Sequence, residues 1–277
     1  MKIIDAFTFF NEVDLLKIRL ELLYPQVDRF LICESNLTHS GHEKKYNYLI
    51  HEKEFEKWKD KITYIQFEQE IKNFDFSTKD TEYNPDSAAW KIENGQRNFL
   101  ATALKNYAPD DLAIISDVDE IWNPSLAQFL RDGRVPYECA RLEMHLNYYY
   151  LNCCGVGVSN SKWFHAYFAS VSLINDGLDL SHARTSKAMK SVGNAGWHFS
   201  YLGGAKKISE KINATAHQET NTPEINNLEH LQRCITLGID HLNRAGHELA
   251  FHPVEYYPVP LANLMRCNPH LVKTSLL

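Results

Sequence analysis

The sequence has no long apolar run and no export signal. No stretch approaches the roughly 18 consecutive apolar residues that a transmembrane helix requires, so no transmembrane segment is predicted. The apolar run at residues 2–10 is interrupted by Asp5 and is followed by no small-residue cleavage site, so a secretory signal peptide is not predicted either. We therefore expect a cytoplasmic protein.

Excess positive charge and paired cysteines are also missing. The formal net charge is -6, from 29 Lys and Arg against 35 Asp and Glu. Binding to a nucleic-acid backbone depends on an excess of basic residues, so we expect no nucleic-acid partner. The six cysteines show no C-x-x-C spacing, which argues against a structural zinc site and favours free thiols in a reducing compartment.

Internal repeats and low-complexity linkers are absent as well. The chain has 277 residues, of which 44% are hydrophobic and 12% aromatic, and this is ample apolar material for a core. We predict a single domain over residues 1–277.

Hydrophobic periodicity predicts strands and helices in alternation. Buried strands are expected at residues 2–10, 29–35, 62–67 and 111–116. Helices are expected at residues 12–24, 51–60, 86–107 and directly after Asn123-Pro124. This order predicts an α/β fold whose mostly parallel sheet is flanked by helices. A smaller mixed region should follow, with strands at 137–152, 161–174 and 195–202, helices at 205–217 and 223–238, and a tail of loops.

An acidic cluster follows the fourth predicted strand. In "LAIISDVDEIW", residues 112–122, an apolar run leads directly into Asp117, Asp119 and Glu120. Open α/β sheets bind ligands beyond the carboxyl ends of their strands. Carboxylates at this spacing in a turn suit Mg²⁺ or Mn²⁺, which would hold the phosphates of a substrate. A solvated loop with a capping aspartate is the alternative.

Two other functions compete for these residues. A haloacid-dehalogenase-type phosphohydrolase also places a D-x-D motif at a strand end, with the first Asp as nucleophile. Such enzymes carry the motif on the first strand, whereas here it follows the fourth. The other alternative is a non-catalytic protein that binds a sugar nucleotide or a glycan.

Five stretches occur in one order over roughly residues 1–220. They are "DAFTFFNEVDLLKIRL", "ESNLTHSG", "NFLATALKNYAPDDLAIISDVDEI", "AGWHFSYLGG" and "KINATAHQE". Taken together, they resemble glycosyltransferase family 17, whose best-known members add a bisecting N-acetylglucosamine to glycoproteins.

The resemblance implies a GT-A-like fold, with a nucleotide-sugar-binding half at 1–135 and an acceptor half with a C-terminal wrap at 136–277. It implies a UDP-sugar donor, expected to be UDP-N-acetylglucosamine, and a glycan acceptor. Asp119 would bind Mn²⁺ or Mg²⁺, and Asp117 would assist through the ribose or a metal-bound water. A metal ion at the diphosphate would act as a Lewis acid.

Further residues are candidates for contacts to the donor. Asn11, Glu12 and Glu34 lie at the ends of the first two predicted strands, where the nucleoside would sit. Helix capping is the alternative for Asn11 and Glu12. Arg97 would either reach the pyrophosphate or form an ordinary salt bridge.

The stretch "GWHFS" holds two more candidates. Trp197 and His198 follow Gly196, where backbone can approach a ligand closely. We expect Trp197 to contact the donor and His198 to bind the metal or the sugar, and a packed core histidine is the alternative. The run Tyr148–Tyr150 is assigned to the core.

An inverting displacement also needs a carboxylate that takes the acceptor's proton on the face opposite the diphosphate. This base should come from the second half of the chain, near the acceptor. Glu143 is the first candidate, because a carboxylate in an otherwise apolar strand needs a reason. The other candidates are Glu219, Asp176 and Asp179, and the two loop aspartates are alternatively turn residues.

Overall fold

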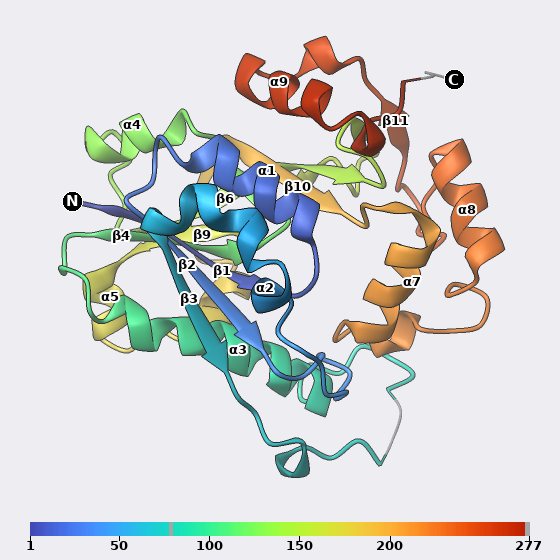
Figure 1. Ribbon diagram of the computed structural model, residues 1–277, viewed down its shortest axis with the longest axis horizontal. Helices are drawn as coiled ribbons and strands as arrows, with labels where there is room; N and C mark the ends of the chain where they lie inside the picture. The colour runs from blue at the N-terminus through green and yellow to red at the C-terminus, as the bar shows by residue number, and fades with distance from the viewer. Residues whose placement is uncertain (78–79, 275–277) are drawn as a thin grey trace.

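The computed structural model describes residues 1–77 and 80–274, and a large sheet runs through its centre (Figure 1). The strands are β1 (Ile3–Phe9), β2 (Arg29–Ser35), β3 (Ile62–Phe67), β4 (Leu112–Asp117), β5 (Glu120–Trp122), β6 (Cys139–Tyr148), β7 (Cys153–Gly155), β8 (Lys162–Trp163), β9 (Tyr167–Ser170), β10 (Ser191–Ser200) and β11 (Leu249–Phe251). In the described part of the chain they form one sheet with the order β11-β7-β6-β9-β4-β1-β2-β3, while β10 pairs with β5 and β6, and β8 with β6.

Helices surround this sheet. The α-helices are α1 (Val13–Leu23), α2 (Asn47–Ile50), α3 (Ala88–Leu104), α4 (Leu126–Arg131), α5 (Val171–Asn175), α6 (Leu180–Thr185), α7 (Gly204–Ala214), α8 (Leu228–Leu237) and α9 (Val259–Cys267). The 3₁₀-helices are η1 (Glu52–Lys61), η2 (Ile71–Asn73), η3 (Gln218–Thr220), η4 (Val254–Tyr256) and η5 (Pro269–Leu271).

The first half of the chain builds the parallel part of the sheet. β3, β2, β1 and β4 are neighbours and run parallel. Every residue of β1 is buried, because helices cover both of its faces, and this explains its apolar run. The predicted α/β fold is confirmed, and the predicted parallel strands are those of this half of the sheet.

The second half adds the mixed region. β9 pairs antiparallel with both β4 and β6, whereas β10 runs parallel to β6. β5 pairs antiparallel with β10, which places Glu120 opposite His198. Two segments that lie far apart in the sequence are thereby joined at the acidic turn.

Three apolar clusters divide the helices between the two faces and one end of the sheet. α1, α4 and α9 pack on one face, and α3, α5 and α6 pack on the other. α7 and α8 lie side by side against one end of β6 (Figure 1). Within the described ranges, no helix combines the length and the apolar character that a membrane span needs.

Three predicted elements were wrong in detail. Residues 51–60 are largely a 3₁₀-helix rather than an α-helix, and 161–174 hold β8, β9 and α5 rather than one strand. The tail contains α9, which begins beside Pro258 and Pro260 and packs its apolar face on the core. Pro258 and Pro260 lie at the start of this helix, where proline is tolerated.

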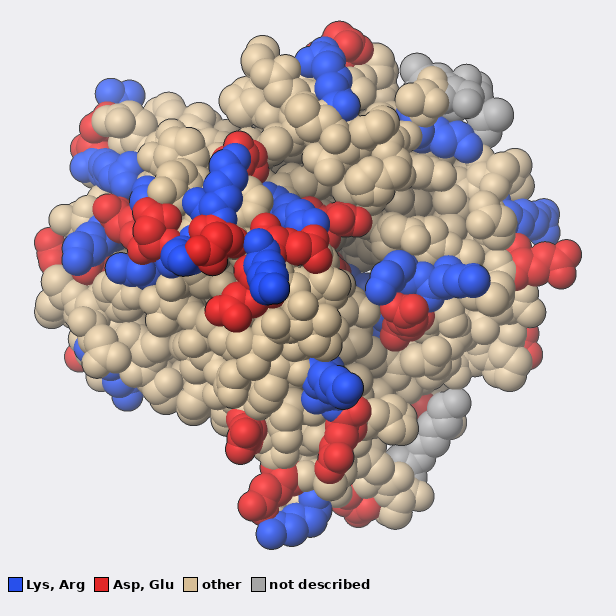
Figure 2. Space-filling model, in the orientation of Figure 1, with Lys and Arg blue, Asp and Glu red and all other residues tan. Residues whose placement is uncertain are grey.

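Charged side chains of both signs mix over α1 and η1 on the face shown in Figure 2. Lys17 pairs with Glu54, and Lys57 pairs with Glu21. Because acidic and basic side chains pair on this face, it carries no single sign of charge.

A buried ion pair joins α1 to β1. Arg19 and Asp5 are both fully buried, and the guanidinium donates from Nε and Nη2 to the two carboxylate oxygens over 2.8 and 2.6 Å. Trp122 Nε1 donates to the same carboxylate over 3.0 Å. This bidentate pair is fully desolvated, so removing one partner would leave the other charge without compensation.

We predict that Arg19→Met lowers the free energy of unfolding by about 3–5 kcal/mol, because Asp5 would keep a buried charge with no cation. Urea unfolding followed by circular dichroism measures this. The matched control is Arg131→Met, which breaks a half-exposed pair with Asp28 and should cost less than about 1 kcal/mol. Equal losses in the two variants would contradict a special role for the buried pair.

Candidate active site

Arg19 also holds the backbone of the acidic turn between β4 and β5. Its Nη1 donates to the carbonyl oxygens of Asp117 over 2.8 Å and Glu120 over 2.9 Å. Its Nη2 donates to Ser116 Oγ over 2.7 Å. The turn therefore has a fixed path, and its side chains leave it in set directions.

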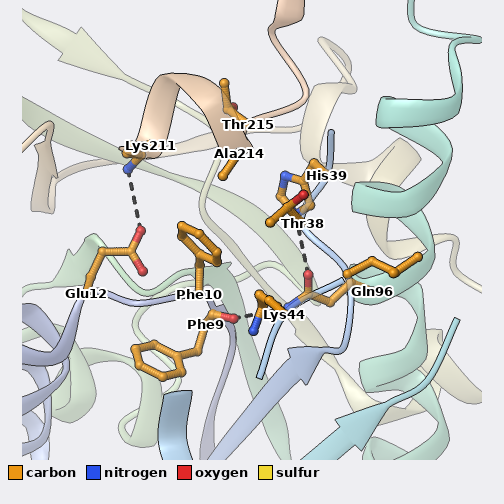
Figure 3. Close-up of a pocket in the computed structure, with 11 residues that line it drawn as sticks. Phe9, Phe10, Glu12, Thr38, His39, Lys44, Gln96, Lys211, Ala214 and Thr215 are labelled. Atoms are coloured by element: carbon orange, nitrogen blue, oxygen red, sulfur yellow. Dashed lines mark hydrogen bonds and ion pairs between the residues drawn. The ribbon is translucent and has the colours of Figure 1, made fainter. Parts of the chain in front are cut away.

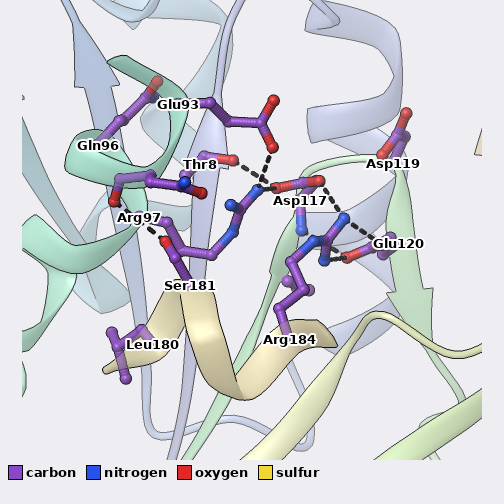
Figure 4. A network of polar contacts seen from close by, with 12 residues as sticks. Thr8, Glu93, Gln96, Arg97, Asp117, Asp119, Glu120, Leu180, Ser181 and Arg184 are labelled. Carbon is purple, nitrogen blue, oxygen red and sulfur yellow. Dashed lines mark hydrogen bonds and ion pairs between the residues drawn. The ribbon is translucent and has the colours of Figure 1, made fainter. Parts of the chain in front are cut away.

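Asp117 is enclosed by cations (Figure 4). One oxygen accepts from Arg97 Nη2 over 2.9 Å and from Thr8 Oγ1 over 2.8 Å. The other accepts from Arg184 Nη2 over 2.5 Å. Burial alone would raise the pKa of Asp117, but the guanidinium groups of Arg184 and Arg97 hold it well below its usual value. Asp117 is thus an anion with both oxygens in use.

Glu120 shares one of these cations. It is fully buried and accepts from Arg184 Nη1 and Nη2, each over 2.8 Å. Trp163 Nε1 donates to it over 2.5 Å. Arg184 therefore bridges two carboxylates of the cluster, and this bridge relieves their mutual repulsion.

Asp119 points away from this network (Figure 4). Its Oδ2 accepts from Lys211 Nζ over 2.6 Å and lies 3.5 Å from His198 Nε2. Burial alone would raise the pKa of Asp119, but Lys211 and His198 hold it below its usual value. His198 is 7% exposed and stacks on Trp163 with ring centroids 4.3 Å apart.

Two cavities meet at Lys211. The smaller, of about 70 Å³, lies at the ends of β1 and β2 under the last turn of α7, and Glu12, Thr38, Gln96 and Lys211 are among its lining residues (Figure 3). The larger, of about 540 Å³, lies between the start of α1 and the start of α7. Glu12 and Lys211 line both.

The predicted donor contacts divide into two groups. Asn11 and Glu12 line the larger cavity. Glu34 does not face a cavity: it is fully buried and accepts from Lys44 Nζ over 2.5 Å and from the backbone N–H groups of Asn47 and Tyr48 over 2.6 and 2.9 Å. Both of its oxygens are occupied, so in the structure Glu34 holds the segment from Lys44 to Tyr48 and does not face the space where a nucleoside was predicted.

Arg97 and Trp197 also have structural surroundings. Arg97 is 2% exposed and is paired with Asp117 and Glu93, so the salt-bridge alternative describes it. Trp197 is 5% exposed and packs in the core cluster of the α1 face. In the structure Arg97 therefore serves as the partner of two carboxylates, and Trp197 serves as a core residue. Neither residue lines either of the two cavities.

None of the predicted bases is among the residues that line either cavity. Glu143 is paired with Lys162 over 2.6 Å, and Glu219 with His217 over 2.6 Å. Asp179 caps α6 by accepting from the backbone N–H of His182. Asp176 follows the last residue of α5. The two loop aspartates are turn and cap residues, as the alternative proposed.

Sequence reasoning missed three cations that hold the acidic turn. Arg184 and Lys211 pair with its carboxylates, and Arg19 donates to its carbonyl oxygens. Each lies on a helix remote from the turn in sequence, so no local pattern marks the pairing. The one indication in the sequence was the cluster of carboxylates itself, because buried carboxylates need cations, and here the cations come from other parts of the fold.

Asp119 and His198 are the side chains that could hold a divalent cation, and a substrate would have to supply its other ligands. Asp119 Oδ2 and His198 Nε2 lie 3.5 Å apart, so one ion can contact both. No three His, Cys, Asp or Glu side chains converge on a metal position in the described residues, but Mg²⁺ is usually bound by one or two carboxylates together with substrate phosphates. Asp117 does not fit as a ligand, because Arg97, Arg184 and Thr8 occupy its oxygens.

Comparison with solved structures gives distant likenesses. S. aureus TarS 1-349, in a crystal structure with UDP-GlcNAc, shares 10% sequence identity, covers 87% of this chain and 71% of its own, and gives a TM-score of 0.38. A 4-diphosphocytidyl-2C-methyl-D-erythritol synthase shares 14% identity over 70% of this chain and 88% of its own, also with a TM-score of 0.38.

Curated relatives match one part of the chain. The β-1,4-mannosyl-glycoprotein 4-β-N-acetylglucosaminyltransferases of Rattus norvegicus and Homo sapiens are each 30% identical over 128 residues, or 43% of this chain. The match spans 21% and 22% of those two proteins, about a fifth of their length. The sequence model of glycosyltransferase family 17 matches residues 1–256. This chain belongs to glycosyltransferase family 17.

Proposed function

We propose that the protein transfers N-acetylglucosamine from UDP-N-acetylglucosamine to a glycan acceptor, with inversion and with the help of a divalent cation. The observation that carries the proposal is the position of Asp119. It is a buried carboxylate at the carboxyl end of β4, beside His198 and next to the junction of two cavities. Family membership and the names of the relatives support the sugar.

The two cavities suggest where the substrates bind. The smaller lies at the ends of β1 and β2, where open α/β sheets bind nucleotides. Its volume of about 70 Å³ is well below the roughly 300–1,000 Å³ of ordinary ligand pockets, so nucleoside binding would require its walls to move. The larger, at about 540 Å³, has room for the donor sugar and part of the acceptor. The diphosphate would then lie at their junction, beside Lys211 and Asp119.

In this arrangement Asp119 and His198 would hold Mn²⁺ or Mg²⁺. When bound, the ion supplies Lewis-acid stabilisation of the leaving diphosphate. The protein's own part is to fix Asp119 through the backbone contacts of Arg19 and to exclude water around a carboxylate that is 4% exposed. The proposal keeps one domain over 1–277 and a cytoplasmic setting, as predicted from the sequence.

The acceptor's base should face the larger cavity. Glu210 lines that cavity and is half-exposed, with Lys207 Nζ 3.0 Å from its carboxylate. Glu143 is held by Lys162 and does not line it. We therefore propose Glu210, in place of Glu143, as the general base.

The phosphohydrolase alternative loses support. It needs the first Asp of the motif to attack phosphorus as a free nucleophile. Arg97, Arg184 and Thr8 occupy both oxygens of Asp117. An anion held in this way is a poor nucleophile.

We predict that UDP raises the melting temperature more with Mn²⁺ than with EDTA, and that Asp119→Asn abolishes the Mn²⁺-dependent part. Ligand at a hundredfold excess over Kd adds about 2.7 kcal/mol of stability, which a thermal melt resolves. The control is Asp110→Asn, whose side chain is 76% exposed, and it should keep the full shift. An equal UDP shift in EDTA and in Mn²⁺ would refute the metal requirement.

We predict that His198→Phe melts near the wild-type temperature and transfers sugar at least about tenfold more slowly, or about 1.4 kcal/mol of barrier. Phe keeps the stacking on Trp163 but removes Nε2 beside Asp119. The control is His165→Phe, which also packs on Trp163 and should keep its activity. A lower melting temperature with normal specific activity would make His198 a core residue only.

We predict that Glu210→Gln binds UDP as tightly as wild type does but transfers sugar at least about a hundredfold more slowly, or about 2.7 kcal/mol at 1.36 kcal/mol per tenfold change. Removal of a general base slows the chemical step and leaves the affinity for the donor unchanged. Glu143→Gln is the comparison and should transfer within about twofold of wild type. If Glu143→Gln alone loses transfer, the base predicted from the sequence is correct.

A further inference from the structure

Lys211 lies where a cation bound to Asp119 would lie. Its ammonium is 2.6 Å from Asp119 Oδ2, the same oxygen that faces His198. Glu12 Oε1 is 3.7 Å away on another side, and the Tyr201 ring centroid is 5.6 Å away. In this conformation the Asp119 carboxylate already has its counter-ion.

The ammonium and a metal ion compete for one oxygen. The Lys211 ammonium lies between two carboxylates, 2.6 Å from Asp119 Oδ2 and 3.7 Å from Glu12 Oε1. A divalent ion bound to Asp119 Oδ2 would therefore face a positive charge at close range. The ion can bind tightly only if the ammonium leaves.

The Lys211 side chain has room to move away from Asp119. Its side chain is 27% exposed, whereas that of Asp119 is 6% exposed, and it lines both cavities. An ammonium on a flexible four-carbon stem, with three donors, suits a phosphate oxygen. An anionic group at the junction of the cavities would offer the ammonium a new partner.

We propose that Lys211 neutralises Asp119 in the free protein and moves onto the donor's diphosphate when the donor binds. The diphosphate thus frees Asp119, and a divalent cation enters together with it. This rests on the proposed use of a nucleoside diphosphate sugar. Because coupling between two ligands is reciprocal, Mn²⁺ and UDP should each tighten the binding of the other, and Lys211 should be the origin of part of that coupling.

Titration calorimetry with Mn²⁺ and UDP as probes tests this. Wild type should bind Mn²⁺ at least tenfold more tightly with saturating UDP than without it. UMP, which lacks the second phosphate, should have little effect on Mn²⁺ affinity. Lys211→Met should bind Mn²⁺ alone at least tenfold more tightly than wild type does, and should bind UDP at least tenfold more weakly. Tenfold corresponds to about 1.4 kcal/mol.

Two further variants keep the test decisive. Lys206→Met removes an exposed lysine of the same helix and should behave as wild type. Lys211→Arg keeps the charge if Lys211→Met does not fold, and should retain weak Mn²⁺ binding in the absence of UDP.

Unchanged Mn²⁺ and UDP affinities in Lys211→Met would overturn the proposal for Lys211 and leave the proposed function intact. Equal Mn²⁺ affinity of wild type with and without UDP would overturn it as well. Failure of wild type to bind UDP under any condition would instead count against the proposed function.

Discussion

The buried guanidinium of Arg19 is the contact on which the site depends. It neutralises Asp5 inside the sheet and, through the same group, binds the carbonyl oxygens of the turn between β4 and β5. A guanidinium suits this task, because its donors diverge in a fixed plane and can serve a carboxylate and several carbonyls at once. The path of the turn, and hence the direction of each acidic side chain, follows from a residue on α1.

Three carboxylates within four positions are tolerable because each is paired with at least one cation. Arg97 and Arg184 serve Asp117, Arg184 also serves Glu120, and Lys211 serves Asp119. Both arginines are held by multiple hydrogen bonds and are nearly buried. Only the Asp119 partner is a lysine that borders the cavities. The cluster thus combines nearly buried arginine pairs with one lysine pair at the edge of the cavities.

Much of the framework could be predicted from the sequence. β2 and β3 coincide with the predicted strands 29–35 and 62–67, and β1 and β4 agree within one residue at each end. Parallel strands inside a sheet leave a continuous apolar signature. Asp119 and His198 were predicted to act together, and the β5–β10 pairing brings them side by side. The contacts of Glu34 to Lys44, Asn47 and Tyr48 were not predictable, because a strand-end carboxylate looks the same in sequence whether it faces a cavity or holds a loop. The partners Arg184 and Lys211 depend on tertiary contacts across 67 and 92 positions, which no local pattern encodes.

The proposed exchange of Lys211 between Asp119 and the diphosphate has a thermodynamic consequence. β4, β5 and β10 fix Asp119 and His198 within the sheet. Lys211 instead projects from α7, which begins at Gly204 after the cap residue Gly203, and these two glycines have φ of 83° and 96°. The last turn of α7 also covers the small cavity that must widen for a nucleoside. Opening this cavity and separating Lys211 from Asp119 therefore involve the same helix. Part of the donor's binding free energy would be used to rearrange α7, so a nucleoside without phosphates should bind weakly: it would need the cavity to open and offer Lys211 no anion in return.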